Sequence, residues 1–158
     1  MKIKRSCFND LYDEMKRPEI SILLGARQVG KSTLMRQLEA KAKREKKKTS
    51  FYDLEQPDHL KSLAGSAKEV MDELTKDAQV VFIDEFHYLK NAFKIFKAIY
   101  DSNKKIKIYA SGSSSLEIHK HLKESLAGRF RKTMIFPLTL EESHQRERFE
   151  LELSLIHI

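Results

Sequence analysis

The chain has 158 residues, a length typical of one domain, which excludes several domains within this stretch. A hydrophobic share of 41% is too high for a disordered tail, and charged residues, 34% of the chain, interrupt the apolar runs well short of a membrane span. The 30 basic and 23 acidic side chains leave a formal net charge of +7, which attracts polyanions without choosing among them.

The N-terminus carries no secretory pattern. Its basic first residues are followed by a helical pattern rich in Asp and Glu, where a signal peptide would have an apolar core. The single cysteine, Cys7, cannot form an internal disulfide, which fits a reducing compartment. We therefore expect a cytoplasmic protein with no membrane partner.

Hydrophobic periodicity predicts alternating helices and strands. In chain order the predicted elements are a helix over 8–15, a strand over 20–24, a helix over 32–48, a strand over 50–53, a helix over 60–74, a strand over 80–83, a helix over 92–100, a strand over 106–110, a helix over 116–126, a strand over 134–136 and a last helix after 139. This alternation is typical of βαβ units, so the predicted fold class is α/β, a mostly parallel sheet in a three-layer αβα sandwich.

Local signals refine several boundaries. Gly65 should weaken the helix that contains it, Asn91 can cap the helix that follows it, and Gly128 would stop the helix before it. Thr139 and Glu142 have the spacing of a capping box for the last helix.

The strongest functional signal is an eight-residue loop between a predicted strand and a predicted helix. Residues 25–32, Gly-Ala-Arg-Gln-Val-Gly-Lys-Ser, fit the phosphate-loop pattern G-x-x-x-x-G-K-[ST] without a mismatch. The glycines let successive N–H groups curl around phosphate oxygens, and the helix N-terminus adds partial positive charge. Lys31 would reach the β- and γ-phosphates, and the Ser32 hydroxyl would be a ligand of Mg²⁺. The predicted nucleotide-binding residues are Gly25, Ala26, Arg27, Gln28, Val29, Gly30, Lys31, Ser32 and Thr33.

Two carboxylates follow the apolar strand over 80–83. Ligands of parallel α/β sheets bind at the carboxyl ends of the strands, which is where Asp84 and Glu85 stand. We expect Asp84 to hold Mg²⁺, mostly through water, and Glu85 to orient or deprotonate an attacking water. His87 either influences Glu85 or simply occupies a strand-to-helix connection.

Two further candidates for catalysis lie later in the chain. The hydroxyl of Ser111, or as second choice Ser113, could contact the γ-phosphate or the attacking water. The alternative is that these serines cap the next helix, and the sequence favours that role for residues 113–115. Arg129 either stabilises transition-state charge on the nucleotide of a neighbouring subunit, which requires a homo-oligomer, or is a surface arginine beside a helix end.

With these elements in order, the chain resembles the AAA+ superfamily, in particular a group of predicted prokaryotic AAA-type ATPases similar to archaeal ATPases. The residues that carry the resemblance are the loop over 25–32, Ile83-Asp84-Glu85, Gly112-Ser113-Ser114, Gly128-Arg129 and the Pro137-Leu138 to Glu142 stretch. The resemblance implies a five-stranded parallel sheet in the order 5-1-4-3-2, ATP with Mg²⁺ as cofactors, and ATP hydrolysis. Ser111 stands where the group commonly has threonine.

Two alternative functions remain open. A small-molecule kinase would use the same phosphate loop, although the adjacent Asp84 and Glu85 suit water activation and no lid is evident. A nucleic-acid-binding module is the other alternative, because the chain carries a dense basic run. That run consists of Lys41, Lys43, Arg44, Lys46, Lys47 and Lys48. Cations at a helix C-terminus are also favoured by the helix dipole without any partner.

The last residues differ in character from the segment before them. We expect residues 1–150 to be the ATPase core, with a lid and further domains missing from this sequence, and residues 151–158 to be a non-native tail. The hypothesis is that an adapter used in DNA sequencing encodes the apolar end over 153–158.

Overall fold

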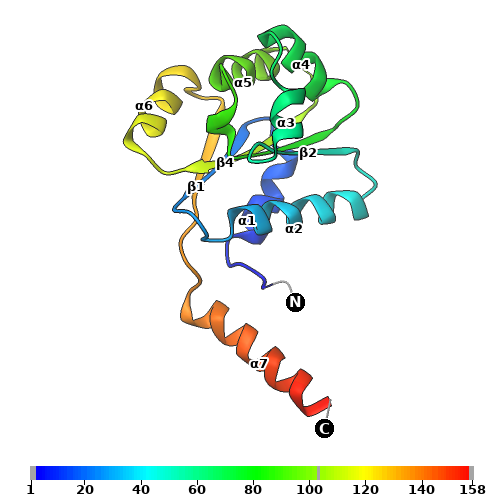
Figure 1. Cartoon of the computed structure of the whole chain (residues 1–158), viewed down its shortest axis with the longest axis vertical. Helices are drawn as coiled ribbons and strands as arrows, with labels where there is room; N and C mark the ends of the chain where they lie inside the picture. The colour runs from blue at the N-terminus through cyan, green and yellow to red at the C-terminus, as the bar shows by residue number, and fades with distance from the viewer. Residues whose placement is uncertain (1–2, 103, 157–158) are drawn as a thin grey trace.

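The computed structural model describes residues 3–102 and 104–156. Its strands are β1 (Ile20–Gly25), β2 (Thr49–Asp53), β3 (Val80–Asp84), β4 (Lys107–Ser113) and β5 (Phe130–Met134). Its helices are α1 (Phe8–Asp13), the 3-10 turn η1 (Glu14–Lys16), α2 (Lys31–Arg44), α3 (Pro57–Ser62), α4 (Ala67–Thr75), the 3-10 turn η2 (Phe86–Tyr88), α5 (Ala92–Asp101), α6 (Leu116–Ser125) and α7 (Leu140–Ile156) (Figure 1).

The described strands form one five-stranded sheet in the order β2-β3-β4-β1-β5, and every neighbouring pair is parallel. This is the predicted order 5-1-4-3-2 read from the other side, so the predicted topology is confirmed. Because the strands are parallel, their carboxyl ends meet at one edge of the sheet, which we call the carboxyl edge, and their amino ends meet at the opposite amino edge.

The two faces of the sheet are covered by different helices. Alternate residues of each strand point to opposite faces, and both faces are buried in the central strands. On β1, Ile22 and Leu24 pack into a core shared with α4, α5 and α6, whereas Leu23 packs into a second core with α1 and α2. Figure 1 shows these helices on opposite sides of the sheet. The predicted three-layer sandwich is confirmed.

The single helix predicted over 60–74 is wrong. The structure has two helices there, α3 and α4, with Gly65 in the break between them. Ser66 begins α4 with a capping box, in which its hydroxyl accepts a hydrogen bond from Glu69 N and the Glu69 carboxylate accepts one from Ser66 N. The reciprocal bonds satisfy two otherwise unpaired donors of the new helix, which favours a break over a continuous helix.

Other boundaries also differ from prediction. The helix predicted to reach residue 48 ends at Arg44, because Lys46 adopts a left-handed conformation (φ 60°) and Lys47 N turns back to bond Ala42 O. Asn91 occupies the position before α5 with a φ of 59°, but a capping hydrogen bond from its side chain is absent among the described residues.

The last strand, predicted over 134–136, is instead β5 and starts at Phe130. β5 lies at the edge of the sheet with Arg131 and Lys132 exposed, so its sequence lacks a buried apolar run.

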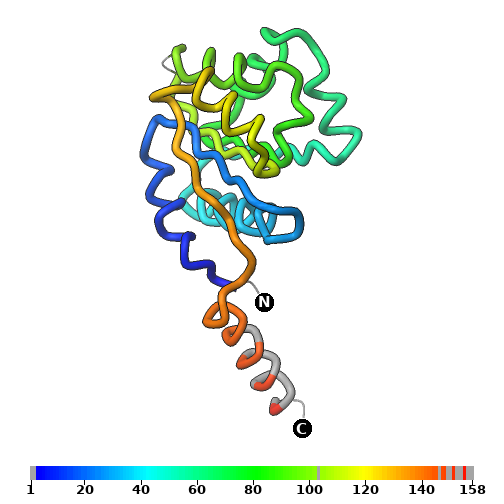
Figure 2. Tube along the Cα trace, turned by 90° about the vertical axis from the view of Figure 1, so that its left-hand side faces the viewer, coloured from blue at the N-terminus to red at the C-terminus, as the bar shows by residue number. Residues whose placement is uncertain are grey.

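The C-terminal helix α7 extends away from the sheet (Figures 1 and 2). Its predicted capping box is confirmed, since Glu142 N donates to Thr139 Oγ1 at 3.2 Å and Thr139 N donates to Glu142 Oε2 at 2.9 Å. Residues 151–156 of the proposed non-native tail continue this helix, and residues 157–158 lie outside the described residues. Within the described part of the chain, the helices lack the combination of length and apolar character that crossing a bilayer requires.

Candidate phosphate and water-activation site

The loop over 25–30, which we call the phosphate loop together with Lys31 and Ser32, connects the carboxyl end of β1 to α2. Two of its residues have left-handed backbone, Gln28 (φ 62°) and Gly30 (φ 91°). Such conformations curl a chain so that backbone N–H groups line a concave surface that binds anions. Ala26 is exposed on the loop, whereas Val29 is buried beneath it.

Lys31 is the first residue of α2 and is buried, with 4% of its surface exposed. Its ammonium group donates hydrogen bonds to Gly25 O (3.1 Å) and Ala26 O (2.7 Å), so it folds back across the loop. The next two residues, Ser32 and Thr33, are exposed on the first turn of the helix. The ammonium group can exchange its carbonyl partners for phosphate oxygens at this place without moving to another part of the fold.

Asp84, Glu85 and Ser111 meet at the same edge of the sheet. The Ser111 hydroxyl, which is fully buried, donates a hydrogen bond to Asp84 Oδ1 and accepts one from Glu85 N at 3.2 Å. Strands β3 and β4 are neighbours, and this bridge ties their ends together. The structure therefore brings all three predicted residues together, with the Ser111 hydroxyl directed at the carboxylate of Asp84.

Glu85 has an unusual backbone and an altered acidity. Its φ of 57° is left-handed, a conformation that is strained for a residue with a side chain and that concentrates at functional sites. Burial raises the pKa of Glu85, the charges of Lys31 and His87 oppose that rise, and the charges of Asp84 and Glu55 add to it. The ammonium group of Lys31 is thus close enough to stabilise the ionised form of this carboxylate.

The histidine two residues further along contacts Glu85 directly. His87 Nδ1 lies 3.2 Å from Glu85 Oε2. The sequence left this contact open as one of two interpretations of His87. Glu55, the other nearby carboxylate, was not predicted, although its position just past β2 at the same edge was a usable signal.

The serine turn after β4 has the structural role that the sequence offered as an alternative. Ser115 Oγ accepts a hydrogen bond from Ile118 N at 3.2 Å and caps α6. Ser113 ends β4 and is partly exposed.

Arg129 lies at the amino edge, away from the other predicted site residues. Its carbonyl oxygen accepts a hydrogen bond from Ile20 N, at the start of β1 (2.9 Å). Its guanidinium Nε donates to Asp101 Oδ1 at 2.8 Å. Arg129 is thus separated from the phosphate loop of its own chain by the length of a strand.

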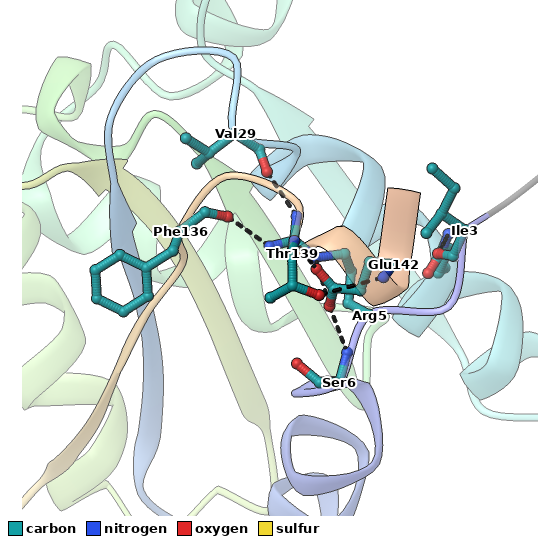
Figure 3. A network of polar contacts seen from close by, with 8 residues as sticks. Ile3, Arg5, Ser6, Val29, Phe136, Thr139 and Glu142 are labelled. Carbon is teal, nitrogen blue, oxygen red and sulfur yellow. Dashed lines mark hydrogen bonds and ion pairs between the residues drawn. The ribbon is translucent and has the colours of Figure 1, made fainter. Parts of the chain in front are cut away.

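Behind the phosphate loop lies a buried ion pair that the sequence did not predict (Figure 3). Arg5 donates from Nη1 to Val29 O (2.7 Å) and from Nε to Glu142 Oε1 (3.3 Å). In the sequence, Glu142 stood out as a capping residue and as the end of the Pro137-Leu138 to Glu142 stretch, neither of which indicated a contact with Arg5. A cavity of about 220 Å³ beside this pair is lined in part by Thr33 and Leu138.

Comparison with known proteins agrees with this geometry. A family model described as an AAA domain matches residues 17–144. Among solved structures, a DNA replication initiation factor superposes with a TM-score of 0.63 at 12% identity, covering 92% of this chain and 48% of that chain. Orc1 of Aeropyrum pernix in complex with DNA gives 0.62 at 12% identity, covering 96% and 50%.

AMPPCP-bound DnaA from Aquifex aeolicus gives a TM-score of 0.59 at 15% identity, covering 92% of this chain and 48% of that chain. At these identities the likeness shows the fold, and the chain spans about half the length of these three proteins. A search of functionally curated proteins found no significant relative.

Proposed function

We propose that this chain, which belongs to the AAA family of P-loop ATPases, is an Mg²⁺-dependent ATPase core. It would hydrolyse ATP to drive a conformational or regulatory output. One observation carries the proposal: the buried ammonium group of Lys31 lies across a loop with left-handed backbone, and its charge acts on Glu85, which a buried hydroxyl ties to Asp84. Cation, anion-binding loop and two carboxylates are the parts that phosphoryl transfer to water requires.

For nucleotide binding, the amides of the phosphate loop and Lys31 would hold the phosphates, with Thr33 beside them. The 220 Å³ cavity has apolar walls that include Leu34 and Leu138 and a polar amide at Gln37, which suits a purine base. Ser32 and Asp84 offer a hydroxyl and a carboxylate, oxygen ligands of the kind that Mg²⁺ prefers. When bound, the metal would supply charge neutralisation to the phosphate oxygens.

For hydrolysis, Glu85 would orient a water and accept its proton, and its raised pKa makes it a stronger base than an exposed glutamate. Ser111 would act through Asp84 by fixing the orientation of that carboxylate. Arg129, which cannot serve its own phosphate loop, would act on the nucleotide of a neighbouring protomer in a homo-oligomer.

The test is phosphate release from ATP without any added acceptor. We expect Glu85→Gln to lower turnover by about 10²- to 10⁴-fold, the usual contribution of a general base, while nucleotide binding persists. Lys31→Ala should abolish binding. Glu55→Gln is the matched control, because it removes another carboxylate at the same edge and should leave turnover near the wild-type value.

Two outcomes would contradict this proposal. Unchanged turnover in Glu85→Gln would exclude water activation by that residue. Phosphate transfer that depends on an added small-molecule acceptor would favour the kinase alternative.

A second candidate function is binding of a nucleic-acid backbone at the amino edge. There a hollow of about 610 Å³ is lined by cationic side chains from three separate segments. Among the described residues these are Lys16, Arg17, Lys47, Lys104, Lys105 and Lys107. Convergent positive charge attracts phosphate backbones, and one of the similar structures is named as a complex with DNA. Of the basic run singled out in the sequence, Lys47 contributes to this hollow.

Salt-dependent binding of duplex DNA tests this second function. Replacing Lys104 and Lys105 by glutamine should weaken binding and reduce the slope of log K against log salt by roughly 0.9 for each phosphate that the protein no longer neutralises. The control replaces Lys120 and Lys123, two exposed lysines of α6, in the same way. If the two double substitutions weakened DNA binding equally, or if binding did not depend on salt concentration, the hollow would not be the DNA-binding surface.

A further inference from the structure

Arg5 links the N-terminal segment to the phosphate loop and to the stretch over 136–142, which are far apart in the sequence (Figure 3). It is 8% exposed, and its planar guanidinium group donates to Val29 O of the phosphate loop (2.7 Å), to Phe136 O after β5 (2.5 Å) and to Glu142 Oε1 in α7 (3.3 Å). The fork of N–H groups on arginine can serve several acceptors in fixed directions, which a lysine cannot.

The bond to Val29 O bears on how the loop binds anions. A trans peptide is planar, so its C=O and N–H groups point in opposite directions. When Arg5 holds the Val29 carbonyl behind the loop, the N–H of Gly30 in the same peptide is directed to the other side. Arg5 also lies close to Gly30 itself, since a Cβ built on this glycine would be 3.3 Å from Arg5 Nη1. Arg5 therefore fixes the orientation of a peptide next to Lys31.

Glu142 holds the other side of the guanidinium group. It is 4% exposed and accepts hydrogen bonds from Ser6 N (2.8 Å) and Thr139 N (2.9 Å) as well as from Arg5. Burial alone would raise the pKa of Glu142, but the N–H donors of Ser6 and Thr139 and the charge of Arg5 lower it to about 2. The carboxylate is therefore ionised, and the ion pair is intact, throughout the physiological pH range.

Figure 2 shows the first described residues beside the start of α7, while the rest of α7 projects away from the sheet. The contacts of Arg5 and Glu142 are thus a direct polar link between α7 and the phosphate loop. A displacement of α7 would remove the Glu142 carboxylate from Arg5, and a change in the shape of the phosphate loop would remove the Val29 carbonyl.

We propose that Arg5 is a positioning residue through which the placement of α7 sets the shape of the phosphate loop, so that nucleotide binding and docking of α7 stabilise each other. This coupling rests on the proposed nucleotide binding. Such coupling is reciprocal by thermodynamic necessity: if docked α7 tightens nucleotide binding by a given factor, bound nucleotide stabilises docked α7 by the same factor.

The experiment measures two quantities on the full chain with Mg²⁺ and a non-hydrolysable ATP analogue: the dissociation constant, and hydrogen exchange of the backbone amides in the first turns of α7. In the wild type, the analogue should slow exchange in α7. In Arg5→Lys, which keeps the charge but loses the fork, we expect affinity to fall roughly tenfold and the protection of α7 by the analogue to disappear.

The matched control is Arg131→Lys. Arg131 pairs with Glu14 through the same atoms at the same distance, Nε to Oε1 at 3.3 Å, but away from the phosphate loop. In Arg131→Lys, both the affinity for the ATP analogue and the protection of α7 by the analogue should equal those of the wild type. Glu142→Gln is the second test variant, for use if Arg5→Lys does not fold, and it should reproduce the loss of coupling.

Each remaining outcome decides a separate question. No binding of the analogue by the wild type would overturn the proposed function itself. Wild-type binding together with unchanged affinity and unchanged α7 protection in Arg5→Lys would overturn the coupling alone. A lower melting temperature in Arg5→Lys with unchanged affinity would show that the ion pair is only structural, and would also overturn the coupling.

Discussion

Two buried lysines stand at opposite edges of one sheet. Lys31, at the carboxyl edge, is 4% exposed, and Lys107, at the amino edge, is 5% exposed. The ammonium group of Lys31 donates to two carbonyls of the phosphate loop, and its charge opposes the rise in the pKa of Glu85. That of Lys107 donates to Glu19 O at 2.5 Å and lies 5.0 Å from the centre of the Tyr109 ring.

The difference teaches that burial of a charge does not by itself mark a catalytic site. At the carboxyl edge the strands run into turns with left-handed backbone at Gln28, Gly30 and Glu85, and the lysine has partners it can exchange for a ligand. At the amino edge Lys107 is held by one backbone carbonyl, and burial is the main influence on its pKa. In a parallel sheet the carboxyl ends of all strands lie at one edge, where ligands bind, and the amino ends lie at the opposite edge. The two lysines differ because they lie at different edges.

The largest expected effect that tests this comparison of the two edges is a change in ATP turnover with pH. If Glu85 acts as a base, turnover falls about tenfold for each pH unit below its pKa, which burial raises above 4.5. The charge of His87 opposes that rise, so His87→Ala should move the acidic limb of the profile to higher pH. Initial rates of phosphate release between pH 5 and pH 8, at saturating ATP, would measure the limb.

His119→Ala is the control for this profile, because His119 lies in α6 and bonds Ser114 and Lys132 instead of Glu85. A limb that stays in place in His87→Ala, or that moves equally in both variants, would show that the pH dependence has another origin.

The second effect concerns two glycines, one at each edge. A Cβ on Gly25 would lie 2.3 Å from the backbone oxygen of Ile135, which cannot move without shifting β5 relative to β1. Gly25→Ala should therefore cost about 3 kcal/mol or more of unfolding free energy and weaken nucleotide binding. Gly128 has open space around its Cα but a φ of +74°, so Gly128→Ala should cost about 1 kcal/mol through backbone strain alone.

Denaturant unfolding with and without nucleotide would measure both variants. Equal costs for Gly25→Ala and Gly128→Ala would mean that the β1–β5 contact relaxes, and that the carboxyl edge is less tightly built than its geometry indicates.

The sequence predicted the central part of the fold because the central strands carry continuous apolar runs, as in 80–83 of β3. It misplaced β5 because an edge strand with exposed Arg131 and Lys132 has no such run. It also joined α3 to α4, although Ser66 and Glu69 had the spacing of a capping box and could have marked the break. These errors are local, and capping patterns carry the signal that would reduce them.

In the candidate site, too, the sequence predicted the parts that contiguous residues form and missed the contacts between distant residues. The phosphate loop and the Asp84–Glu85 pair were predictable, because contiguous residues supply them and the parallel topology places them at one edge. The ion pair between Arg5 and Glu142 was not predictable, because its partners meet only after the sheet has formed and no local pattern encodes the contact. The direction of the Ser111 hydroxyl, toward Asp84, likewise depends on the pairing of β3 with β4.

The smallest effect returns to the two lysines and could break the comparison. Burial, reinforced by Arg131 and Arg17 and opposed by Glu14 and Glu19, lowers the pKa of Lys107 to about 8 from 10.5. Below pH 8 the folded protein must keep a charge in a poorly solvated place, so Lys107→Met should raise the unfolding free energy by about 1 to 2 kcal/mol at pH 7.

The pH dependence of that gain fixes its cause. Between pH 8 and 10.5 the unfolded chain binds the Lys107 proton more strongly than the folded chain, so wild-type stability from this group rises with pH and the advantage of Lys107→Met shrinks. Lys31→Met is the counterpart at the carboxyl edge, where we expect loss of nucleotide binding. Urea unfolding of Lys107→Met at pH 7 and pH 10 measures its gain in stability, and urea unfolding of Lys31→Met with and without nucleotide measures its loss of binding. If Lys107→Met destabilised the protein at pH 7, the bond to Glu19 O would outweigh the cost of burial, and both edges would hold their lysines by favourable contacts.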